Sequence, residues 1–252
     1  MSDSFKQRLA AGDPLLGTFI KTPSPMVCEV LAGTDLDALC IDAEHAPFDR
    51  LAQDQCIHAT RSAGMASLVR VPSSAPEHIL NALDCGATGV LVPHVTGPEQ
   101  AEAIARSSHF GAGGRGYAGS TRAAGYMSKP MAAHLADSAS ETTVIAQIED
   151  VEALEAIDEI AAVDTVDCLF VGRVDLTVAL GASSPADAVV VAAVEKICQS
   201  ARDAGRPVGM FVSDPGEVPR WQAAGANLFL LSSDHGFLVQ GAANLVRTFR
   251  KG

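Results

Sequence analysis

The sequence predicts an α/β fold, a single (β/α)₈ barrel spanning residues 1–252, and three observations support this prediction. Apolar runs typical of strands alternate with helical stretches eight times along the chain. Several repeats end in a glycine just before the next strand, as in SAGMASLVR, CGATGVLV and DAGRPVGMF, which fits a helix end followed by a short loop. The apolar fraction is 48%, but aromatic residues make up only 5%. This aliphatic composition is typical of parallel strands covered by helices.

The strands are predicted from short runs of β-branched and other apolar residues bounded by glycine, proline or charged residues. In chain order they are expected at residues 16–20, 37–41, 66–70, 89–92, 143–148, 168–171, 208–212 and 228–231.

The helices are predicted from capping residues followed by apolar residues at helical spacing. They are expected at residues 25–32, 49–62, 76–85, 97–107, 151–161, 186–204 and 215–223. A final helix is expected to follow Asp234, whose carboxylate suits an N-cap.

The alternative to a barrel is a doubly wound open sheet. Such a sheet has fewer strands and a glycine-rich phosphate-binding turn after the first strand, which the segment GTFIKTPSP lacks. The barrel is therefore preferred. The long segment at residues 109–130, with six glycines, is expected to form a functional loop, as a wall or lid of the barrel mouth.

Composition excludes several classes of partner. The net charge of −12 argues against binding to nucleic acid or to an anionic membrane.

The six cysteines include no C-x-x-C pair, so we expect reduced, mostly buried thiols. The N-terminus resembles no leader, and no apolar run has transmembrane length. We therefore expect a soluble, cytoplasmic protein. The motifs of zinc peptidases, serine hydrolases and P-loop nucleotidases are absent from the sequence.

Polar residues follow several of the predicted strands. In barrels of this type, the chemistry takes place at the carboxyl ends of the strands. From the second, third, fifth and sixth strands these ends carry Asp42, Glu44, His45, Arg70, Gln147, Glu149 and Asp175. We therefore expect these side chains to converge at one end of the barrel and form a site.

Two of the carboxylates suggest a metal. Glu149 and Asp175 are distant in sequence, but neighbouring strands bring their ends together. Two oxygen ligands, completed by water and a chelating substrate, suit a divalent cation such as Mg²⁺ or Mn²⁺. Each acid taken alone would equally suit a helix N-cap. Together with Arg70 and His45, they favour the metal.

The basic residues suggest acid–base chemistry. Arg70 is flanked by apolar residues, so it can grip a carboxylate or stabilise a developing enolate oxygen. His45 can act as a general base if a carboxylate such as Asp42 orients its imidazole. A metal-binding or purely structural role for His45 remains an alternative. Glu44 is expected to support the site, and His94 can reach its rim.

These segments resemble the HpcH/HpaI family of metal-dependent (class II) pyruvate aldolases. The resemblance covers almost the whole chain, in the right order. It rests on DAEHAPFD (42–49), LVRVP (68–72), CGATGVLVPHV (85–95), GGRGY (113–117), QIE (147–149), LFVGRVDLTVALG (169–181) and SSDHGFL (232–238).

The resemblance implies an enzyme that reversibly cleaves 4-hydroxy-2-oxoacids to pyruvate, or a related 2-oxoacid, and an aldehyde through an enolate. It implies that Glu149 and Asp175 hold Mg²⁺ or Mn²⁺, with Co²⁺ or Zn²⁺ as further options, and that the substrate chelates this metal. Gln147, Gly172 and the backbone amides of Val174 and Asp175 would hold the substrate.

The resemblance also implies that His45 is the base, that Arg70 stabilises the enolate and that Asp84 raises the basicity of His45. Sequence proximity favours Asp42 for this last role. Asp84 lies near a predicted helix end on the far face of the barrel, so it would act through a bend of that helix or from a neighbouring subunit. The family suggests a homo-oligomer, a hexamer built as a trimer of dimers.

Three positions bear on the aldehyde that is accepted. Many relatives have proline where this chain has Arg173, which adds a positive charge near the mouth. Relatives often have tryptophan where this chain has Phe19. Phe211, at the end of the seventh strand, is a further candidate for the pocket, with core packing as the alternative.

Two other functions remain possible. One is an acyl-CoA ester lyase of the citramalyl- or malyl-CoA type, although 18 Lys and Arg residues are few for binding a nucleotide. The other is a non-catalytic barrel that acts as a binding protein. The presence of His45, Arg70, Glu149 and Asp175 argues against it.

Overall fold

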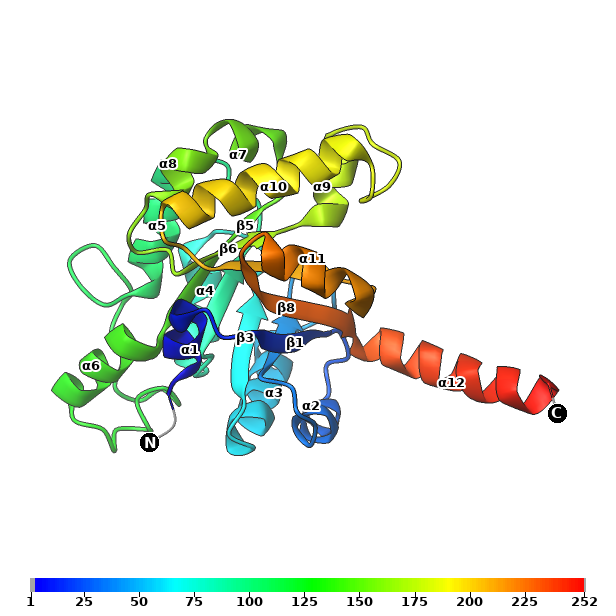
Figure 1. The fold of residues 1–252 in the computed structure, drawn as a ribbon. Coiled ribbons are helices and arrows are strands. Elements are labelled where there is room, and N and C mark those ends of the chain that lie inside the picture. The colour runs from blue at the N-terminus through cyan, green and yellow to red at the C-terminus, as the bar shows by residue number, and fades with distance from the viewer. Residues whose placement is uncertain (1–2, 252) are drawn as a thin grey trace.

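The computed structural model describes residues 3–251 and forms a closed barrel of eight parallel strands, ordered β1 to β8, with helices around it (Figure 1). The strands are β1 (Leu15–Ile20), β2 (Ala38–Asp42), β3 (Ala66–Arg70), β4 (Gly89–Val92), β5 (Thr143–Ile148), β6 (Cys168–Val171), β7 (Val208–Val212) and β8 (Ala226–Ser233). The predicted (β/α)₈ barrel is confirmed, and five strands have the predicted bounds.

The helices largely follow the predicted pattern. They are α1 (Phe5–Ala11), α2 (Pro25–Ala32), α3 (Arg50–Ser62), α4 (Pro76–Asp84), α5 (Pro98–Ser108), α6 (Met131–Glu141), α7 (Val151–Glu155), α8 (Ile157–Ala161), α9 (Arg173–Ala179), α10 (Ala188–Asp203), the 3₁₀ turn η1 (Pro215–Glu217), α11 (Val218–Ala223) and α12 (Asp234–Lys251). Three of them, α1, α6 and α9, are absent from the sequence-based prediction.

Alternation along the strands divides the core into two layers. Successive side chains of a strand point to opposite faces. The inward set fills the barrel and is closed at its amino-terminal end by Phe5 and Leu9 of α1; it includes Leu15, Phe19, Ala38, Cys40, Leu68, Leu91, Ile145, Cys168, Phe170, Leu228 and Leu230. The outward set packs against the surrounding helices.

The long segment 109–130 does not lie at the barrel mouth. It follows α5, which carries the chain back to the end where the strands begin. There the backbone N–H of Ala123 donates to the carbonyl oxygen of Asp84 (3.3 Å), and Arg122 pairs with Asp54 of α3 (2.6 Å). The predicted wall or lid is therefore wrong, because a loop between a helix and the next strand is on the opposite face from the site.

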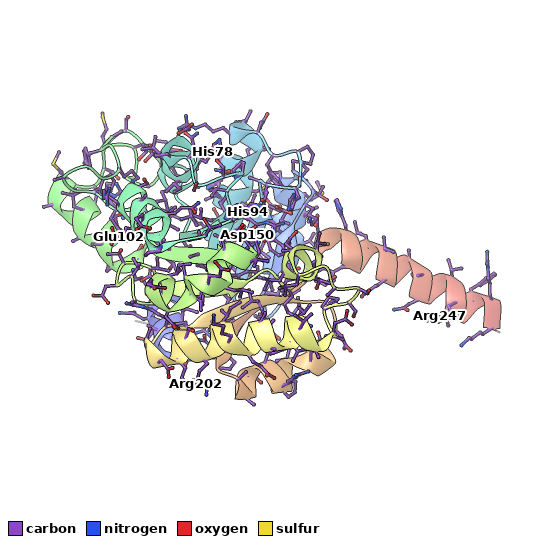
Figure 2. All side chains as sticks on the ribbon, turned by 90° about the horizontal axis from the view of Figure 1, so that it is seen from above. His78, His94, Glu102, Asp150, Arg202 and Arg247 are labelled. Carbon is purple, nitrogen blue, oxygen red and sulfur yellow. The ribbon has the colours of Figure 1, made fainter. Side chains whose placement is uncertain are left out.

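The last helix, α12, projects away from the barrel (Figures 1 and 2). Its far half exposes large apolar side chains, with Leu245 74% and Phe249 87% exposed. In a closed (β/α)₈ barrel, the helix that follows the last strand would pack beside the helix that follows the first strand. Here that neighbour, α2, leaves Met26 and Val30 each 69% exposed.

The start of α12 is fixed to the barrel by Asp234, which the structure places as the first helical residue. Its buried carboxylate accepts hydrogen bonds from the backbone N–H groups of Lys21 (2.8 Å) and Thr22 (2.9 Å). The carboxylate of Asp234, expected to cap α12, thus binds the backbone of the segment that follows β1 instead.

Two further observations concern the chain as a whole. Within residues 3–251, no helix combines the length and apolar character needed to cross a membrane. All six cysteines are buried and unpaired.

Candidate active site

The alternation along the strands determines which polar residues face the mouth. In β2, Ala38 and Cys40 point into the barrel, so Asp42 at its end does as well. In β3, Leu68 points into the barrel, so Arg70, two residues later, does as well. In β5, Ile145 points into the barrel, so Gln147 and then Glu149 follow on the same side. The site is therefore a continuation of the barrel interior into polar residues.

Asp42 lies at the centre of a buried ion-pair cluster. Its Oδ1 accepts from Arg70 Nε (3.0 Å), and its Oδ2 accepts from Arg70 Nη2 (2.8 Å) and from Lys21 Nζ (2.7 Å). Burial alone would raise the pKa of Asp42, but the hydrogen bonds and charges of Arg70 and Lys21 lower it to about 2. Burial would likewise lower the pKa of Arg70, but Asp42 outweighs it and raises that pKa. Both groups therefore remain charged.

Asp42 does not contact the imidazole of His45. Its Oδ1 accepts from the backbone N–H of His45 (3.1 Å), so it positions the backbone rather than the ring. The carboxylate near the ring is Glu44, whose Oε2 lies 3.5 Å from His45 Nε2 and 3.3 Å from Arg70 Nε. The expectation that Asp42 orients the imidazole is corrected by this geometry, in which Glu44 is the carboxylate nearest to the ring.

Glu44 is an unusual carboxylate. Its Oε2 is buried and makes no hydrogen bond with any residue from 3 to 251, and burial raises its pKa although Arg70, His45 and His94 oppose this. Burial and the neighbouring cations thus act on the pKa of Glu44 in opposite directions. From the sequence, Glu44 is expected only to support the site. Its position two residues after Asp42 is the signal that its side chain also points into the mouth.

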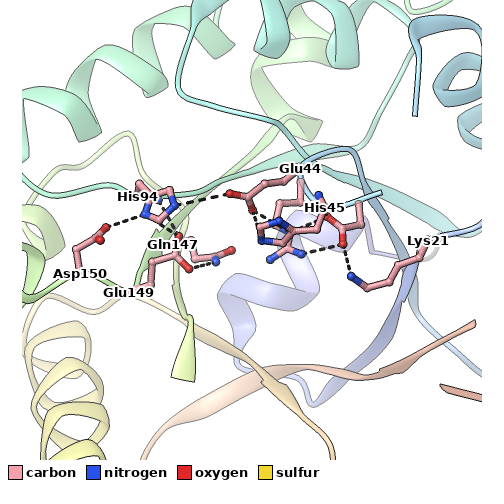
Figure 3. Close-up of polar contacts among 9 residues, drawn as sticks. Lys21, Glu44, His45, His94, Gln147, Glu149 and Asp150 are labelled. Carbon is pink, nitrogen blue, oxygen red and sulfur yellow. Dashed lines mark hydrogen bonds and ion pairs between the residues drawn. The ribbon is translucent and has the colours of Figure 1, made fainter. Parts of the chain in front are cut away.

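A second group of polar side chains lies around Glu149 (Figure 3). The amide of Gln147 donates to Glu149 Oε2, and the backbone N–H of His94 donates to Oε1 (3.0 Å). The ring of His94 contacts Asp150, with 3.0 Å between Nδ1 and Oδ2 (Figures 2 and 3). His94 adopts a positive φ of 55°, which turns its N–H towards Glu149.

The surroundings of Glu149 favour a cation. Burial raises the pKa of Glu149, and the negative charge of Asp175 adds to this rise. Gly172 lets the Glu149 side chain pack closely against its backbone, since a Cβ there would lie 2.6 Å from Glu149 Oε2. Gln147 Oε1 is also buried and without a hydrogen bond within residues 3–251. These features fit a divalent ion held by Glu149 and Asp175.

The protein would supply few of the ligands. In the described part of the chain, no group of three or more His, Cys, Asp and Glu side chains is arranged to hold a metal ion. Asp175 and Val174 are exposed in the first turn of α9, open to the mouth. A bound ion would take its other ligands from the substrate and water.

Phe19 lies beneath Arg70, and Phe211 lies beside Phe19. The guanidinium lies 4.5 Å from the ring centre of Phe19, and the rings of Phe19 and Phe211 are 6.0 Å apart. Phe19 is buried in the barrel interior and Phe211 is partly exposed. Phe211 therefore presents the more accessible apolar surface.

Arg173 does not add a free positive charge to the mouth. Its buried guanidinium makes two hydrogen bonds to Glu217 (2.9 and 3.0 Å) and lies 5.1 Å from the ring centre of Trp221. The expectation of an added charge is thereby corrected, because Glu217 neutralises it. Arg173 instead ties the start of α9 to η1 and α11.

Asp84 is at the opposite end of the barrel from His45, because it ends α4 just before β4. Burial raises its pKa, opposed by the charges of Arg115 and Arg50. Within the described chain it makes no hydrogen bond or ion pair with His45. A direct role for Asp84 at the site would therefore need a neighbouring subunit.

Comparison with known proteins agrees with this geometry. The family model named HpcH/HpaI aldolase/citrate lyase matches residues 15–240. A 5-keto-4-deoxy-D-glucarate aldolase of Shigella boydii is 34% identical over 99% of this chain and 97% of its own length. A hydroxypyruvate/pyruvate aldolase of Paraburkholderia phytofirmans is 32% identical, over 99% and 98%. The crystal structure of an HpcH/HpaI aldolase/citrate lyase family protein from Burkholderia cenocepacia superposes with a TM-score of 0.93 at 31% identity, covering 99% of this chain and 100% of that one.

The Asp42 cluster predicts a defined acid dependence of stability. Asp42→Asn leaves Arg70 buried without its counter-charge, so at pH 7 we expect the free energy of unfolding to fall by roughly 3 kcal/mol. Because the folded-state pKa of Asp42 is depressed from 3.8 to about 2, its contribution is complete above pH 4 and is lost as the pH falls through 2. The difference between wild type and variant, measured by urea unfolding, should narrow over that window.

The control is Asp164→Asn, which removes an exposed carboxylate that pairs with Arg206 at 2.7 Å. We expect a change of less than about 1 kcal/mol. An equal loss in both variants, or a difference for Asp42→Asn that does not narrow with acid, would contradict the assignment.

Proposed function

The chain belongs to the HpcH/HpaI aldolase/citrate lyase family, and from this premise we propose that it is a metal-dependent class II aldolase that reversibly cleaves 4-hydroxy-2-oxoacids to pyruvate, or a related 2-oxoacid, and an aldehyde. Its relatives of 31–34% identity over nearly the full length are aldolases, so the chain is a carbon–carbon lyase. The substrate class and the metal are the proposal.

The observation that carries the proposal is the pairing of opposite features at one mouth. On the side of β5 and β6, the carboxylates of Glu149 and Asp175 are close enough for their charges to interact. On the side of β2 and β3, Arg70 is a permanent cation and His45 an exposed imidazole. A 2-oxoacid spanning the mouth would meet both.

The donor would be held by residues of β5 and α9. The side-chain amide of Gln147 and the backbone N–H groups of Val174 and Asp175 would bind the carboxylate and 2-oxo oxygens. When bound to Glu149 and Asp175, a divalent cation such as Mg²⁺ or Mn²⁺ would polarise the 2-oxo group.

In the cleavage direction, His45 takes the proton of the C4 hydroxyl. The C3–C4 bond then breaks, the aldehyde leaves, and the electron pair moves to the 2-oxo oxygen as an enolate. Arg70 stabilises the developing negative charge on that oxygen. The proton held by His45 is then given to C3, which yields pyruvate and returns His45 to its neutral form. Glu44, 3.5 Å from the ring of His45, steadies the imidazole as its charge changes.

We extend the proposal to the assembly, a homo-oligomer built as a trimer of dimers. The support is α12, whose apolar side is Leu238, Ala242, Leu245 and Phe249, at helical spacing. Each chain exposes this side and also the uncovered Met26 and Val30 of α2. Two copies can satisfy both surfaces by exchanging α12, since a twofold interface repeats the same contacts in each direction.

We also place the enzyme in the cytoplasm and propose small molecules as its partners. Six unpaired thiols suit a reducing compartment. The net charge of −12 argues against nucleic acid and anionic membranes.

The metal requirement can be tested on the intact enzyme. Chelator treatment should abolish pyruvate release from a 4-hydroxy-2-oxoacid, and added Mg²⁺ or Mn²⁺ should restore it. Glu149→Gln keeps the shape of the side chain but removes its charge. The Kd for Mn²⁺, measured by titration, should therefore rise at least tenfold, which is a loss of about 1.4 kcal/mol or more of binding free energy. Glu102→Gln, an exposed carboxylate on α5, should bind Mn²⁺ as the wild type does. Full activity in chelator would rule out the metal.

The role of Arg70 can be measured without an aldehyde. Arg70→Ala should slow the exchange of pyruvate methyl protons with deuterated solvent by about 10²–10³-fold, the loss typical of removing one donor to an oxyanion. The exchange is followed by proton NMR. Arg106→Ala, an exposed arginine of α5, is the matched control and should keep the wild-type rate. Undiminished exchange in a folded Arg70→Ala would remove Arg70 from the mechanism.

The assembly can be tested through α12. Replacing Leu245 and Phe249 together by glutamate puts two charges on its apolar side and should shift the protein to a smaller species by light scattering. Gln240→Glu alters the opposite side of the same helix and should leave the mass unchanged. A wild-type monomer, or a double variant with wild-type mass, would contradict the exchange of α12.

A further inference from the structure

A cavity lies at the end of the barrel opposite the mouth. Its volume is about 370 Å³, and it is bounded by α1, α6 and the segments that lead into β3, β4 and β5. The segment 109–130, which the proposed chemistry does not use, contributes Arg115 and Lys129 to its wall. A cavity of this size can take a small molecule.

Arg115 is a buried cation in the wall of this cavity. Its side chain is only 6% exposed, and its Nε is buried and makes no hydrogen bond with any residue from 3 to 251. The guanidinium lies 4.0 Å from the ring centre of Phe110. Burial lowers its pKa, and the one charge that opposes this, Asp84, forms no ion pair with it in the described chain. A buried guanidinium is costly unless an anion meets it, so Arg115 would gain from an external anion.

His134 of α6 is a second buried polar group in the same wall. It is 3% exposed, and its ring packs edge-on against Phe110, with 5.3 Å between the ring centres. Burial lowers the pKa of His134, and the positive charges of Arg115 and Lys129 lower it further. The ring is therefore neutral at pH 7 and keeps one N–H donor.

The turn that carries Arg115 is fixed by its own backbone. The N–H of Arg115 donates to the carbonyl oxygen of His109 (2.8 Å), and the N–H of Gly114 donates to that of Gly111 (3.1 Å). Gly113 has a positive φ of 71°, a conformation that glycine adopts without strain. The position of Arg115 is thus set before any ligand binds.

The other charged groups of the cavity compete little with Arg115. Lys129 is paired with Asp137, with 2.7 Å between Nζ and Oδ2. The remaining charged residues of the wall are exposed, so water and salt screen them; they are Asp3, Arg61 and Glu141. Arg115 is therefore the charged group of this wall that is both buried and uncompensated.

We propose that this cavity binds a small oxyanion, a molecule that ends in a carboxylate or a phosphate. Arg115 is the main ligand, and the ring N–H of His134 is a second donor. A guanidinium presents paired N–H groups that match two oxygens of either anion. The site lies at the far end of the barrel from His45 and Arg70, so it does not depend on the proposed aldolase function.

The test is a binding titration of the full-length protein with two probes, inorganic phosphate and acetate, followed by phosphorus and proton NMR. Arg115→Met keeps an apolar stem but removes the charge. The Kd of the tighter probe should therefore rise at least tenfold, the loss of a charge-assisted pair of hydrogen bonds. Tighter binding of phosphate would identify a phosphate-bearing ligand, and tighter binding of acetate a carboxylic acid. An anion held by the cations of the mouth would be unaffected by this variant.

Two variants of His134 keep the test decisive if Arg115→Met does not fold. His134→Phe preserves the aromatic packing but removes the donor, so the Kd should rise by about three- to tenfold, the loss of one neutral hydrogen bond. His134→Gln keeps an N–H donor and should retain most of the affinity.

The matched control is Arg106→Met, which removes an exposed arginine near the end of α5 and should bind both probes as the wild type does. Wild-type affinity in folded Arg115→Met, or in His134→Phe, would overturn the proposal, as would a wild-type protein that binds neither probe. A smaller species of Arg115→Met in light scattering would assign Arg115 to a subunit interface and would overturn it as well.

Discussion

The buried carboxylate of Asp42 is the constraint on which one half of the site depends. It binds Arg70 through both oxygens, holds Lys21 Nζ and accepts the backbone N–H of His45. Residues that follow three different strands are thereby fixed by one anion. A carboxylate removed from water is stable there only because cations surround it, so the cluster forms as a unit. Asp42 thereby fixes the guanidinium of Arg70 and the backbone at His45, while the imidazole of His45 stays exposed.

The other half of the site is built on the opposite principle. Glu149 is as buried as Asp42, but its partners are the amide of Gln147 and the backbone N–H of His94 rather than a lysine or arginine. Burial therefore raises the pKa of Glu149, whereas the neighbouring cations lower the pKa of Asp42. Two buried carboxylates in one barrel thus differ in whether their charge is already compensated. The uncompensated one is where an external cation gains most.

The alternation of side chains explains how much of this could be predicted. The parity that puts Leu68 and Ile145 in the barrel also brings Arg70 and Glu149 to the mouth, so the fold and most of the site follow from local pattern. The ion pair between Asp42 and Arg70 does not follow from local pattern. It depends on the register between β2 and β3, which places Asp42 beside Arg70. Glu217, which neutralises Arg173, is 44 residues away and no local pattern links them. The location of segment 109–130 was predictable from topology, since it follows a helix.

The close packing at Gly172 has a consequence for redesign. A methyl group there would overlap Glu149 and approach Gln147, and the next residue, Arg173, is locked between Glu217 and Trp221. Gly172 and Arg173 are thus two adjacent positions where a substitution disturbs neighbouring side chains. The opposite wall, with partly exposed Phe211 and Lys21, has more room. Substitutions at the mouth would therefore be tolerated more readily at Phe211 and Lys21 than at Gly172 and Arg173.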